Sequence, residues 1–249
     1  MTRPYTIAEG VLTINGVDIV TDLPGNYAAY GCRDDVLYMA KGDAHLQAYA
    51  GLASRHGPVR NLVEIGVFRG GSVAFFHEFL DHPKMICIER NVAPVPKLEA
   101  YRAARHDIAI HYGVDQGDRP AIHRIMEQSR SDIDWVIDDA SHFYQPSRAS
   151  FEAIFPFLRP GGLYIIEDAA WAHSGPAQDP EHPWARQPAL TNLILELVVA
   201  CMTNVSAFAE VYAGPGFCWV RRGWAELPRD GSFSLSDHLL TRGRTLEPI

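Results

Sequence analysis

Short apolar runs alternate with longer segments of helical periodicity along the middle of this chain. The apolar runs stand at the start of 61–80 and at 85–88, 108–112, 135–137 and 163–166. Unbroken runs of this length are typical of strands that are buried on both faces of a parallel sheet. The periodic segments predict helices at the end of 61–80 and at about 43–55, 94–105, 119–130 and 190–203. The alternation indicates an α/β fold.

The clearest unit runs from Asp134 to Asp168 and has the pattern strand, helix, strand. Its helical part repeats apolar residues at three- and four-residue spacing: Phe151, Ile154, Phe155 and Leu158. Pro146 suits the first turn of this helix, and we expect Pro160-Gly161-Gly162 to end it. The unit therefore predicts a βαβ motif with parallel strands and a right-handed crossover.

The N-terminal part carries smaller elements. Asn15-Gly16 between apolar-rich flanks predicts a type I′ hairpin at 11–20. The segment 25–45 mixes glycine with aromatic and charged residues, and it either covers a ligand or packs on the domain. We therefore expect an N-terminal appendage at 1–58 and the main domain at 59–249.

A long proline-rich loop is predicted at 169–188, after the central unit. Loops of this length usually serve as lids or binding loops. Four of its side chains either line an acceptor pocket or simply pack: Trp171, His173, His182 and Trp184. Beyond the next helix, 207–212 and 217–221 predict a hairpin that adds antiparallel strands to the sheet.

Composition narrows the class of protein. The 249 residues suffice for one α/β domain, and 47% hydrophobic with 21% charged residues argue against long disorder. The net charge of −8 gives no basic surface for nucleic acid and disfavours anionic membranes. The first ten residues lack the apolar core of a signal peptide, and the four cysteines show no CxxC spacing. We expect a soluble cytoplasmic protein without a zinc cluster or a disulfide framework.

Four carboxylates follow the two strands of the central unit: Asp138, Asp139, Glu167 and Asp168. Parallel neighbours end at the same sheet edge, about 4.8 Å apart, so these groups can converge on one small cation. Any one of them alone would more often be a helix cap or a solvated loop end. Their number, and His142 three residues after Asp139, favour a site at the edge where open α/β sheets bind ligands.

A glycine-rich turn from Glu64 to Ser72 joins the first strand of the sheet to its helix. Glycines suit a sharp bend and the close approach of a ligand. The dinucleotide pattern G-x-G-x-x-G is absent, because Val67 and Phe68 follow Gly66. This disfavours a nicotinamide-dependent dehydrogenase.

The next two strands also end in polar residues. The second ends at Glu89, where an acid can accept hydrogen bonds from both hydroxyls of a ribose. A surface glutamate beside Arg90 is the plainer alternative. The third strand leads to Asp115-Gln116, a pair that we expect next to the base of the same nucleoside.

Together these motifs resemble class I S-adenosylmethionine-dependent methyltransferases. The resemblance covers about 60–222 and rests on E-I-G-x-x-x-G-x-S at 64–72, the acid at 89, DQ at 115–116, DDASH at 138–142, PGGLYIIED at 160–168 and the final hairpin. DDASH and PGGLYIIED resemble the metal-dependent branch with the macrolide and rhamnosyl sugar O-methyltransferases and the cephalosporin-hydroxylase-type proteins. The resemblance implies a Rossmann-like, doubly wound, mostly parallel seven-stranded sheet with a C-terminal antiparallel hairpin.

The resemblance also implies a role for each matching residue. The methionine part of S-adenosylmethionine would be bound by Glu64, Gly66, Gly70 and Ser72, and its amino group by Asp138. Glu89 would bind the ribose. Asp115 and Gln116 would bind the adenine. Mg²⁺ would be bound by Asp139, Glu167 and Asp168. The catalytic residues would be Asp139 and His142, with His142 as the general base.

The implied reaction is methyl transfer from S-adenosylmethionine to a hydroxyl of a vicinal diol, on a sugar of a small-molecule natural product such as an antibiotic. A catechol-type acceptor and a cephalosporin-hydroxylase-like tailoring reaction stay open, although His142 and Glu167-Asp168 stand where catechol enzymes have lysine and Asp-Asn. A cofactor-binding partner subunit without turnover is the non-enzymatic alternative. Ala140, where relatives commonly have glycine, leaves the turn before His142 open. The short N-terminal region leaves open the acceptor and assembly as a homo-oligomer.

Overall fold

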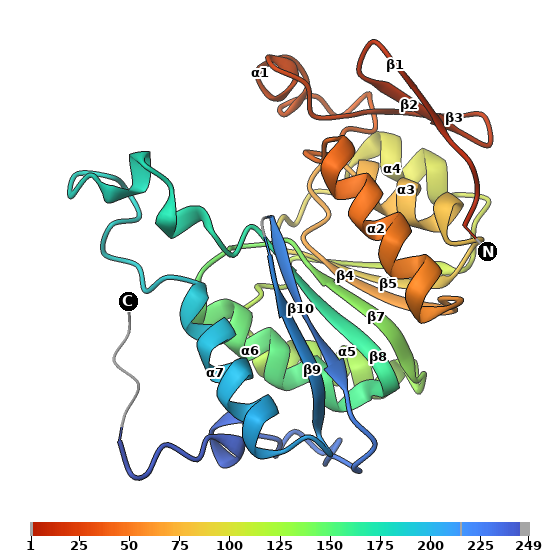
Figure 1. Ribbon diagram of the computed structural model, residues 1–249. Helices are drawn as coiled ribbons and strands as arrows, with labels where there is room; N and C mark the ends of the chain where they lie inside the picture. The colour runs from red at the N-terminus through yellow and green to blue at the C-terminus, as the bar shows by residue number, and fades with distance from the viewer. Residues whose placement is uncertain (1, 215, 245–249) are drawn as a thin grey trace. The chain divides into compact units, whose positions relative to one another are not determined.

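The computed structural model describes residues 2–214 and 216–244, which fall into two compact units. The first unit is Met1–Gly113 and the second is Val114–Ile249. Each unit contributes strands and helices of the predicted α/β type (Figure 1). Among the described helices, none combines the length and the apolarity that crossing a bilayer requires.

The core of the first unit is three parallel strands with their connecting helices. The strands are β4 (Asn61–Ile65), β5 (Lys84–Glu89) and β6 (Ile108–Tyr112), and the helices are α2 (Asp43–His56), α3 (Gly71–Phe79) and α4 (Pro96–Arg102). Ile88 of β5 pairs with both Ile65 and His111, so the three strands run in register. Every residue of α3 is buried, including the polar residues Ser72, His77 and Glu78. The predicted elements of this part are confirmed.

A small antiparallel sheet precedes this core. It consists of β1 (Thr6–Ala8), β2 (Val11–Ile14) and β3 (Val17–Val20), and the short helix α1 (Asn26–Tyr30) follows it. Asn15 and Gly16 have φ angles of 49° and 77°, as a type I′ turn requires, so the predicted hairpin is confirmed. β1 was missed, because all three of its residues are exposed and no apolar alternation marks it.

The second unit contains four strands and three helices of regular structure. The strands are β7 (Ile133–Asp138), β8 (Leu158–Glu167), β9 (Phe208–Ala213) and β10 (Phe217–Arg222), and the helices are α5 (Arg119–Ser129), α6 (Tyr144–Ile154) and α7 (Thr191–Thr203). β7 and β8 are parallel, and β10 is antiparallel to both β8 and β9. In Figure 1 the helices α5, α6 and α7 lie side by side. The predicted hairpin is confirmed, although Pro215 of its connection lies outside the described residues.

Short 3₁₀ turns complete the second unit: η1 (Phe155–Phe157), η2 (Trp171–His173), η3 (Pro176–Gln178) and η4 (Leu235–His238). Among the described residues the seven larger strands have the order β6-β5-β4-β7-β8-β10-β9. The sheet is mostly parallel, and its antiparallel pairs lie in β8-β10-β9. The fold class predicted from the sequence is therefore confirmed.

The prediction for Pro160-Gly161-Gly162 was wrong. Helix α6 ends at Ile154, and the three residues lie inside β8, which already begins at Leu158. The pairing with β7 jumps between its first two pairs, Ile133–Leu158 and Trp135–Leu163, so this stretch forms a bulge. Gly161 takes a φ of 83° there, a conformation that favours glycine. The glycines allow the strand to bulge and do not end the helix.

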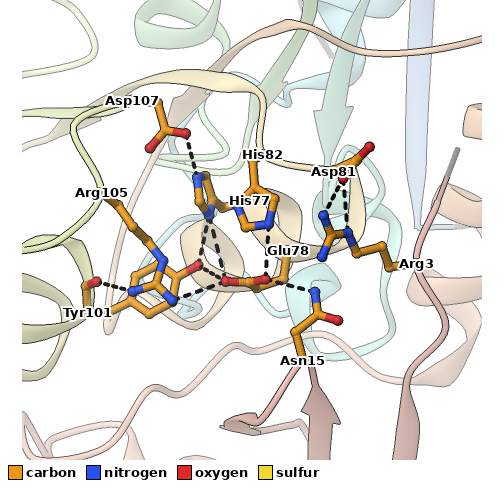
Figure 2. Close-up of polar contacts among 9 residues, drawn as sticks. All are labelled: Arg3, Asn15, His77, Glu78, Asp81, His82, Tyr101, Arg105 and Asp107. Atoms are coloured by element: carbon orange, nitrogen blue, oxygen red, sulfur yellow. Dashed lines mark hydrogen bonds and ion pairs between the residues drawn. The ribbon is translucent and has the colours of Figure 1, made fainter.

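In the first unit, one buried carboxylate joins three segments of the chain (Figure 2). Glu78 of α3 accepts hydrogen bonds from Asn15 Nδ2 at 2.8 Å, from the Tyr101 hydroxyl at 2.9 Å and from Arg105 at 3.3 Å. The neighbouring His77 is buried and bonds the same Tyr101 hydroxyl through Nδ1 at 2.9 Å. These contacts connect the β2–β3 hairpin and helix α4 to α3.

The titration of His77 and Glu78 makes the first unit sensitive to acid. Burial lowers the pKa of His77, and the Asp107 carboxylate offsets part of this effect. Burial alone would raise the pKa of Glu78, but the hydrogen bonds from Asn15 and Tyr101 outweigh it and lower the pKa. In both cases the unfolded chain binds the proton more readily, so protonation favours unfolding.

We predict that the free energy of unfolding falls as the pH drops below 6.5, the ordinary pKa of histidine, and falls further below 4.5 as Glu78 titrates. His77→Gln should flatten the first decline, because glutamine takes up no proton. Urea unfolding from pH 7.5 to 5 measures this, with the exposed His106→Gln as the matched control. Equal pH slopes in the two variants would show that His77 does not cause the acid sensitivity.

Candidate active site

Two carboxylates and one histidine meet where β7 and β8 end. His142 Nε2 lies 3.8 Å from Asp139 Oδ1 and 3.9 Å from Asp168 Oδ2. Asp139 directly follows β7 and Asp168 directly follows β8, and the pairing of Asp138 with Ile166 sets the two ends side by side. The ligand atoms of this acidic cluster all lie within 4.8 Å of one another. The structure thus brings three of the predicted site residues together.

Two members of the acidic cluster have strained backbone conformations. His142 and Asp168 take φ angles of 58° and 52°, in the left-handed region that side chains other than glycine rarely adopt. Such conformations cost about 1–3 kcal/mol each and persist only where surrounding contacts enforce them. The Asp168 N–H donates to the carbonyl of Gly216 at 2.9 Å, and the carbonyl of His142 accepts from Trp171 Nε1 at 2.5 Å. These hydrogen bonds hold Asp168 and His142 in their left-handed conformations.

The donor set of the acidic cluster suits a hard divalent cation. The side chains of Asp139 and Asp168 are 25% and 57% exposed, so solvent and a ligand can reach them. Carboxylate oxygens are the ligands that Mg²⁺ prefers, and this ion keeps coordination positions for water or substrate. His142 Nδ1 is buried without a hydrogen-bond partner among the described residues, which leaves its ring to interact through Nε2. The residues present fit a bound Mg²⁺.

Glu167 occupies a different position from the other predicted metal ligands. It is the last residue of β8, is 3% exposed and pairs with Phe217 of β10. It lies outside the acidic cluster. Its role as a third carboxylate ligand stays a prediction.

A buried polar network lies directly behind the acidic cluster. Gln116 Nε2 donates to Asp138 Oδ1 at 2.6 Å, and Gln116 Oε1 accepts from the backbone N–H and the hydroxyl of Ser141 at 3.1 and 2.5 Å. Asp138 Oδ2 accepts from the hydroxyls of Tyr164 and Ser150 at 3.0 and 3.1 Å. The amide of Gln116 thus fastens the turn that carries Asp139 and His142 to the end of β7.

This network was not predicted from the sequence, which placed Gln116 beside an adenine and Asp138 at an amino group. Burial raises the pKa of Asp138 to about 7, although the hydrogen bonds from Tyr164 and Ser150 offset part of this effect. Asp115, in contrast, is exposed and accepts from the Gly117 N–H at 2.8 Å. The cofactor contacts of these residues stay predictions.

The glycine-rich turn of the first unit has the conformation that its sequence suggests. Gly66 and Gly70 have φ angles of 93° and 76°. The carboxylate of Glu89 closes the turn, because its Oε2 accepts from the N–H groups of Val67 and Phe68 at 2.9 and 3.0 Å. Its Oε1 accepts from the Asn91 N–H at 2.8 Å, so the backbone uses three of about four lone-pair sites of this carboxylate and about one is left for a ligand hydroxyl. The glycine-rich turn and the acid at the end of β5 are therefore neighbours.

The N-terminal segment packs on this turn. Tyr38 is fully buried and forms a parallel bridge to Gly70, and a Cβ on Gly71 would come within 2.4 Å of the Tyr38 carbonyl carbon. The rings of Tyr27 and Phe68 stack with centroids 6.1 Å apart. Packing on the domain, one of the two roles considered for 25–45, is therefore observed. The other predicted residues of the turn, Glu64 and Ser72, are both buried.

Comparison with known proteins gives a family for the middle of the chain. Residues 63–169 match the model of a methyltransferase domain. The chain is 46% identical over 70 residues to mycinamicin VI 2″-O-methyltransferase from Micromonospora griseorubida and 54% identical over 51 residues to demethylmacrocin O-methyltransferase from Streptomyces fradiae. These segments cover 27% and 19% of this chain, and 17% and 13% of the two relatives.

Solved structures with this fold include two methyltransferases. MycE from the mycinamycin biosynthetic pathway, in complex with Mg and SAH, superposes with a TM-score of 0.53 at 24% identity over 70% of this chain. The alignment covers 49% of MycE, so this chain spans about half of its length. The O-methyltransferase TomG from Streptomyces achromogenes, involved in tomaymycin synthesis and complexed with SAM, has a TM-score of 0.53 at 17% identity, over 80% of this chain and 86% of its own. These likenesses show the fold.

We predict that Gln116→Ala loosens the turn that carries Asp139 and His142. The change leaves Asp138 Oδ1 and Ser141 without their amide partner, which should cost about 1–3 kcal/mol of unfolding free energy. Mg²⁺ affinity should fall as well, because the carboxylate of Asp139 is no longer held in place. Urea unfolding and Mg²⁺ calorimetry measure the two effects, with the exposed Gln145→Ala of α6 as the control. If the two variants behave alike, the network does not position the acidic cluster.

Proposed function

We propose that this chain, whose residues 63–169 form a class I S-adenosylmethionine-dependent methyltransferase domain, is a Mg²⁺-dependent O-methyltransferase. Its acceptor is a vicinal diol on a sugar of a small-molecule natural product. The observation that carries the proposal is the convergence of Asp139, His142 and Asp168 at the ends of two adjacent parallel strands. Methyl transfer to oxygen needs a positioned acceptor hydroxyl and a base. This cluster can position the hydroxyl and supply the base.

The relatives support the choice of acceptor. Their names describe O-methyltransferases of mycinamicin VI, L-olivosyl-oleandolide and rhamnosyl tetracenomycin-C. The structure of MycE that contains mycinamycin VI also contains Mg. A catechol acceptor is the second candidate among enzymes, and a cofactor-binding subunit without turnover is the non-enzymatic one.

We assign the metal to the carboxylates of Asp139, Glu167 and Asp168. A Mg²⁺ ion held by these carboxylates would supply a Lewis acid, which would make an acceptor hydroxyl more acidic. The protein's own contribution is to hold the side chains of Asp139 and Asp168 close together at the ends of β7 and β8. The buried network behind them keeps the position rigid, which favours a single orientation of the diol.

We assign the proton to His142. Its Nε2 faces the position where the acceptor hydroxyl would lie, between Asp139 and Asp168. As the acceptor oxygen bonds to the methyl carbon, the carbon–sulfur bond breaks and its electron pair stays on sulfur. The hydroxyl proton passes to Nε2, and the products are the methyl ether and S-adenosylhomocysteine.

We assign the cofactor's methionine part to Glu64, Gly66, Gly70 and Ser72, and its ribose to Glu89. Glycines in this turn have no side chain, so a ligand can come close to the backbone there. Glu89 shapes this turn through three backbone N–H groups and keeps about one acceptor site for a ribose hydroxyl. We assign the cofactor's adenine to Asp115 and Gln116, and its amino group to Asp138.

We predict that the protein transfers a labelled methyl group to glycosides only when Mg²⁺ is present. Mass spectrometry of products from methyl-labelled S-adenosylmethionine, with a panel of rhamnosides and catechols, measures this. Asp168→Asn should abolish the transfer. Asp179→Asn, which changes an exposed loop carboxylate, serves as the matched control and should not affect it.

Each other outcome of this experiment contradicts a separate part of the proposal. Full activity in excess chelator would remove the metal. Methylation of catechols alone would replace the sugar acceptor with a phenol. Cofactor binding without product from any acceptor would favour the subunit without turnover.

We predict that His142→Ala lowers kcat by roughly 10²–10⁴-fold, the usual contribution of a positioned base. The affinities for S-adenosylmethionine and Mg²⁺ should stay near those of the wild type. Steady-state kinetics and calorimetry measure these effects, with His106→Ala as the control, because His106 is exposed and lies outside the acidic cluster. Unchanged kcat would exclude His142 as the base, and a parallel loss of Mg²⁺ affinity would identify it as a metal ligand instead.

A further inference from the structure

Three aromatic rings meet in the second unit beside the acidic cluster: Phe143, Trp171 and Trp184. We call them the aromatic group. Their centroids lie 5.9 Å apart for Phe143 and Trp171, 5.3 Å for Phe143 and Trp184, and 5.1 Å for the two tryptophans. Phe143 directly precedes α6, and the tryptophans come from the loop 169–188. Residues more than forty positions apart along the chain thus form one apolar cluster.

The aromatic group is joined to two members of the acidic cluster. Trp171 Nε1 donates to the carbonyl of His142 at 2.5 Å, and the Trp171 backbone N–H donates to the carbonyl of Asp168 at 3.2 Å. Phe143 is next to His142 in the chain and forms an antiparallel bridge to Ala189 at the end of the loop. These contacts place the aromatic group directly beside the acidic cluster.

The aromatic group is not a closed core of its loop. None of the three residues is buried, and Trp184 keeps 39% of its surface exposed. The ring planes of the three pairs meet at 84°, 87° and 82°, so the packing is edge to face. The His182 ring also packs edge to face against Trp184, with centroids 5.8 Å apart, and Trp184 stays exposed despite these contacts. Its exposed surface can contact another apolar molecule.

We infer that the aromatic group binds the apolar ring system to which the acceptor's sugar is attached. This inference rests on the proposed function, because it assumes that the sugar diol lies at the acidic cluster. A diol held by Asp139 and Asp168 puts the rest of the acceptor beside this edge, and the neighbouring contact surface is aromatic and uncharged. Such a surface stabilises an apolar ring by burial and stacking and adds little for a free sugar.

The inference makes Trp184 a specificity residue, and paired ligands test it. Calorimetry with S-adenosylhomocysteine and Mg²⁺ present compares naphthyl and methyl glycosides of the same sugar. The wild type should bind the naphthyl glycoside more tightly. Trp184→Ala should weaken naphthyl glycoside binding about 10-fold, as loss of an exposed-edge aromatic contact does, and methyl glycoside binding less than about twofold. Trp184→Phe should be intermediate, because it keeps an aromatic face.

Trp224→Ala is the matched control, since Trp224 is also exposed, at 67%, and lies outside the aromatic group. Thermal unfolding confirms that each variant is folded. Equal naphthyl affinity in Trp184→Ala and Trp224→Ala would overturn the inference, as would a wild type that does not distinguish the two glycosides. If the naphthyl glycoside binds in a Trp184-dependent way but no glycoside is methylated, the proposed reaction fails and the aromatic group keeps its role. If both glycosides are methylated equally by all variants, only the inference fails.

Discussion

The parallel pairing of β7 with β8 is the constraint on which the candidate site depends. Because Asp138 pairs with Ile166, the two strands end within one residue of each other, and Asp139 and Asp168 follow them at one sheet edge. A shift of one residue would turn either strand's last side chain to the opposite face of the sheet. The bulge at Arg159–Gly162 lets the pairing start at Leu158 and still bring these ends together. The register of two buried strands thus sets the geometry of the acidic cluster.

Buried polar groups hold the turn that follows β7 in place. The ordered turn after β7 depends on Gln116, which bonds Asp138 on one side and Ser141 on the other. Unpaired polar groups in such a place are costly, so a fully bonded network has one stable arrangement. That arrangement supports the left-handed backbone of His142. Stability and function are therefore linked at this edge, because the same contacts serve both.

The sequence was sufficient to predict the strands and helices of the larger sheet and three members of the acidic edge, because apolar runs and carboxylates at strand ends follow from local pattern. It misplaced Pro160-Gly161-Gly162, since a glycine pair after a helix can end the helix or allow a strand to bulge, and only the pairing with β7 decides. It also missed the partners of Asp138. Ser150 and Tyr164 lie twelve and twenty-six residues away, so no local spacing connects them to it. The meeting of Phe143 with the loop tryptophans is equally nonlocal.

For the proposed reaction, the carboxylates at the ends of β7 and β8 must bind a divalent cation. Anomalous diffraction from crystals grown with Mn²⁺ and S-adenosylhomocysteine tests this most directly, because Mn²⁺ takes the same oxygen ligands as Mg²⁺ and its position can be seen. We expect one Mn²⁺ peak in coordination contact with Asp139 and Asp168. No peak there, or a peak only at the other group of potential ligands, His77, Glu78 and His82, would contradict it.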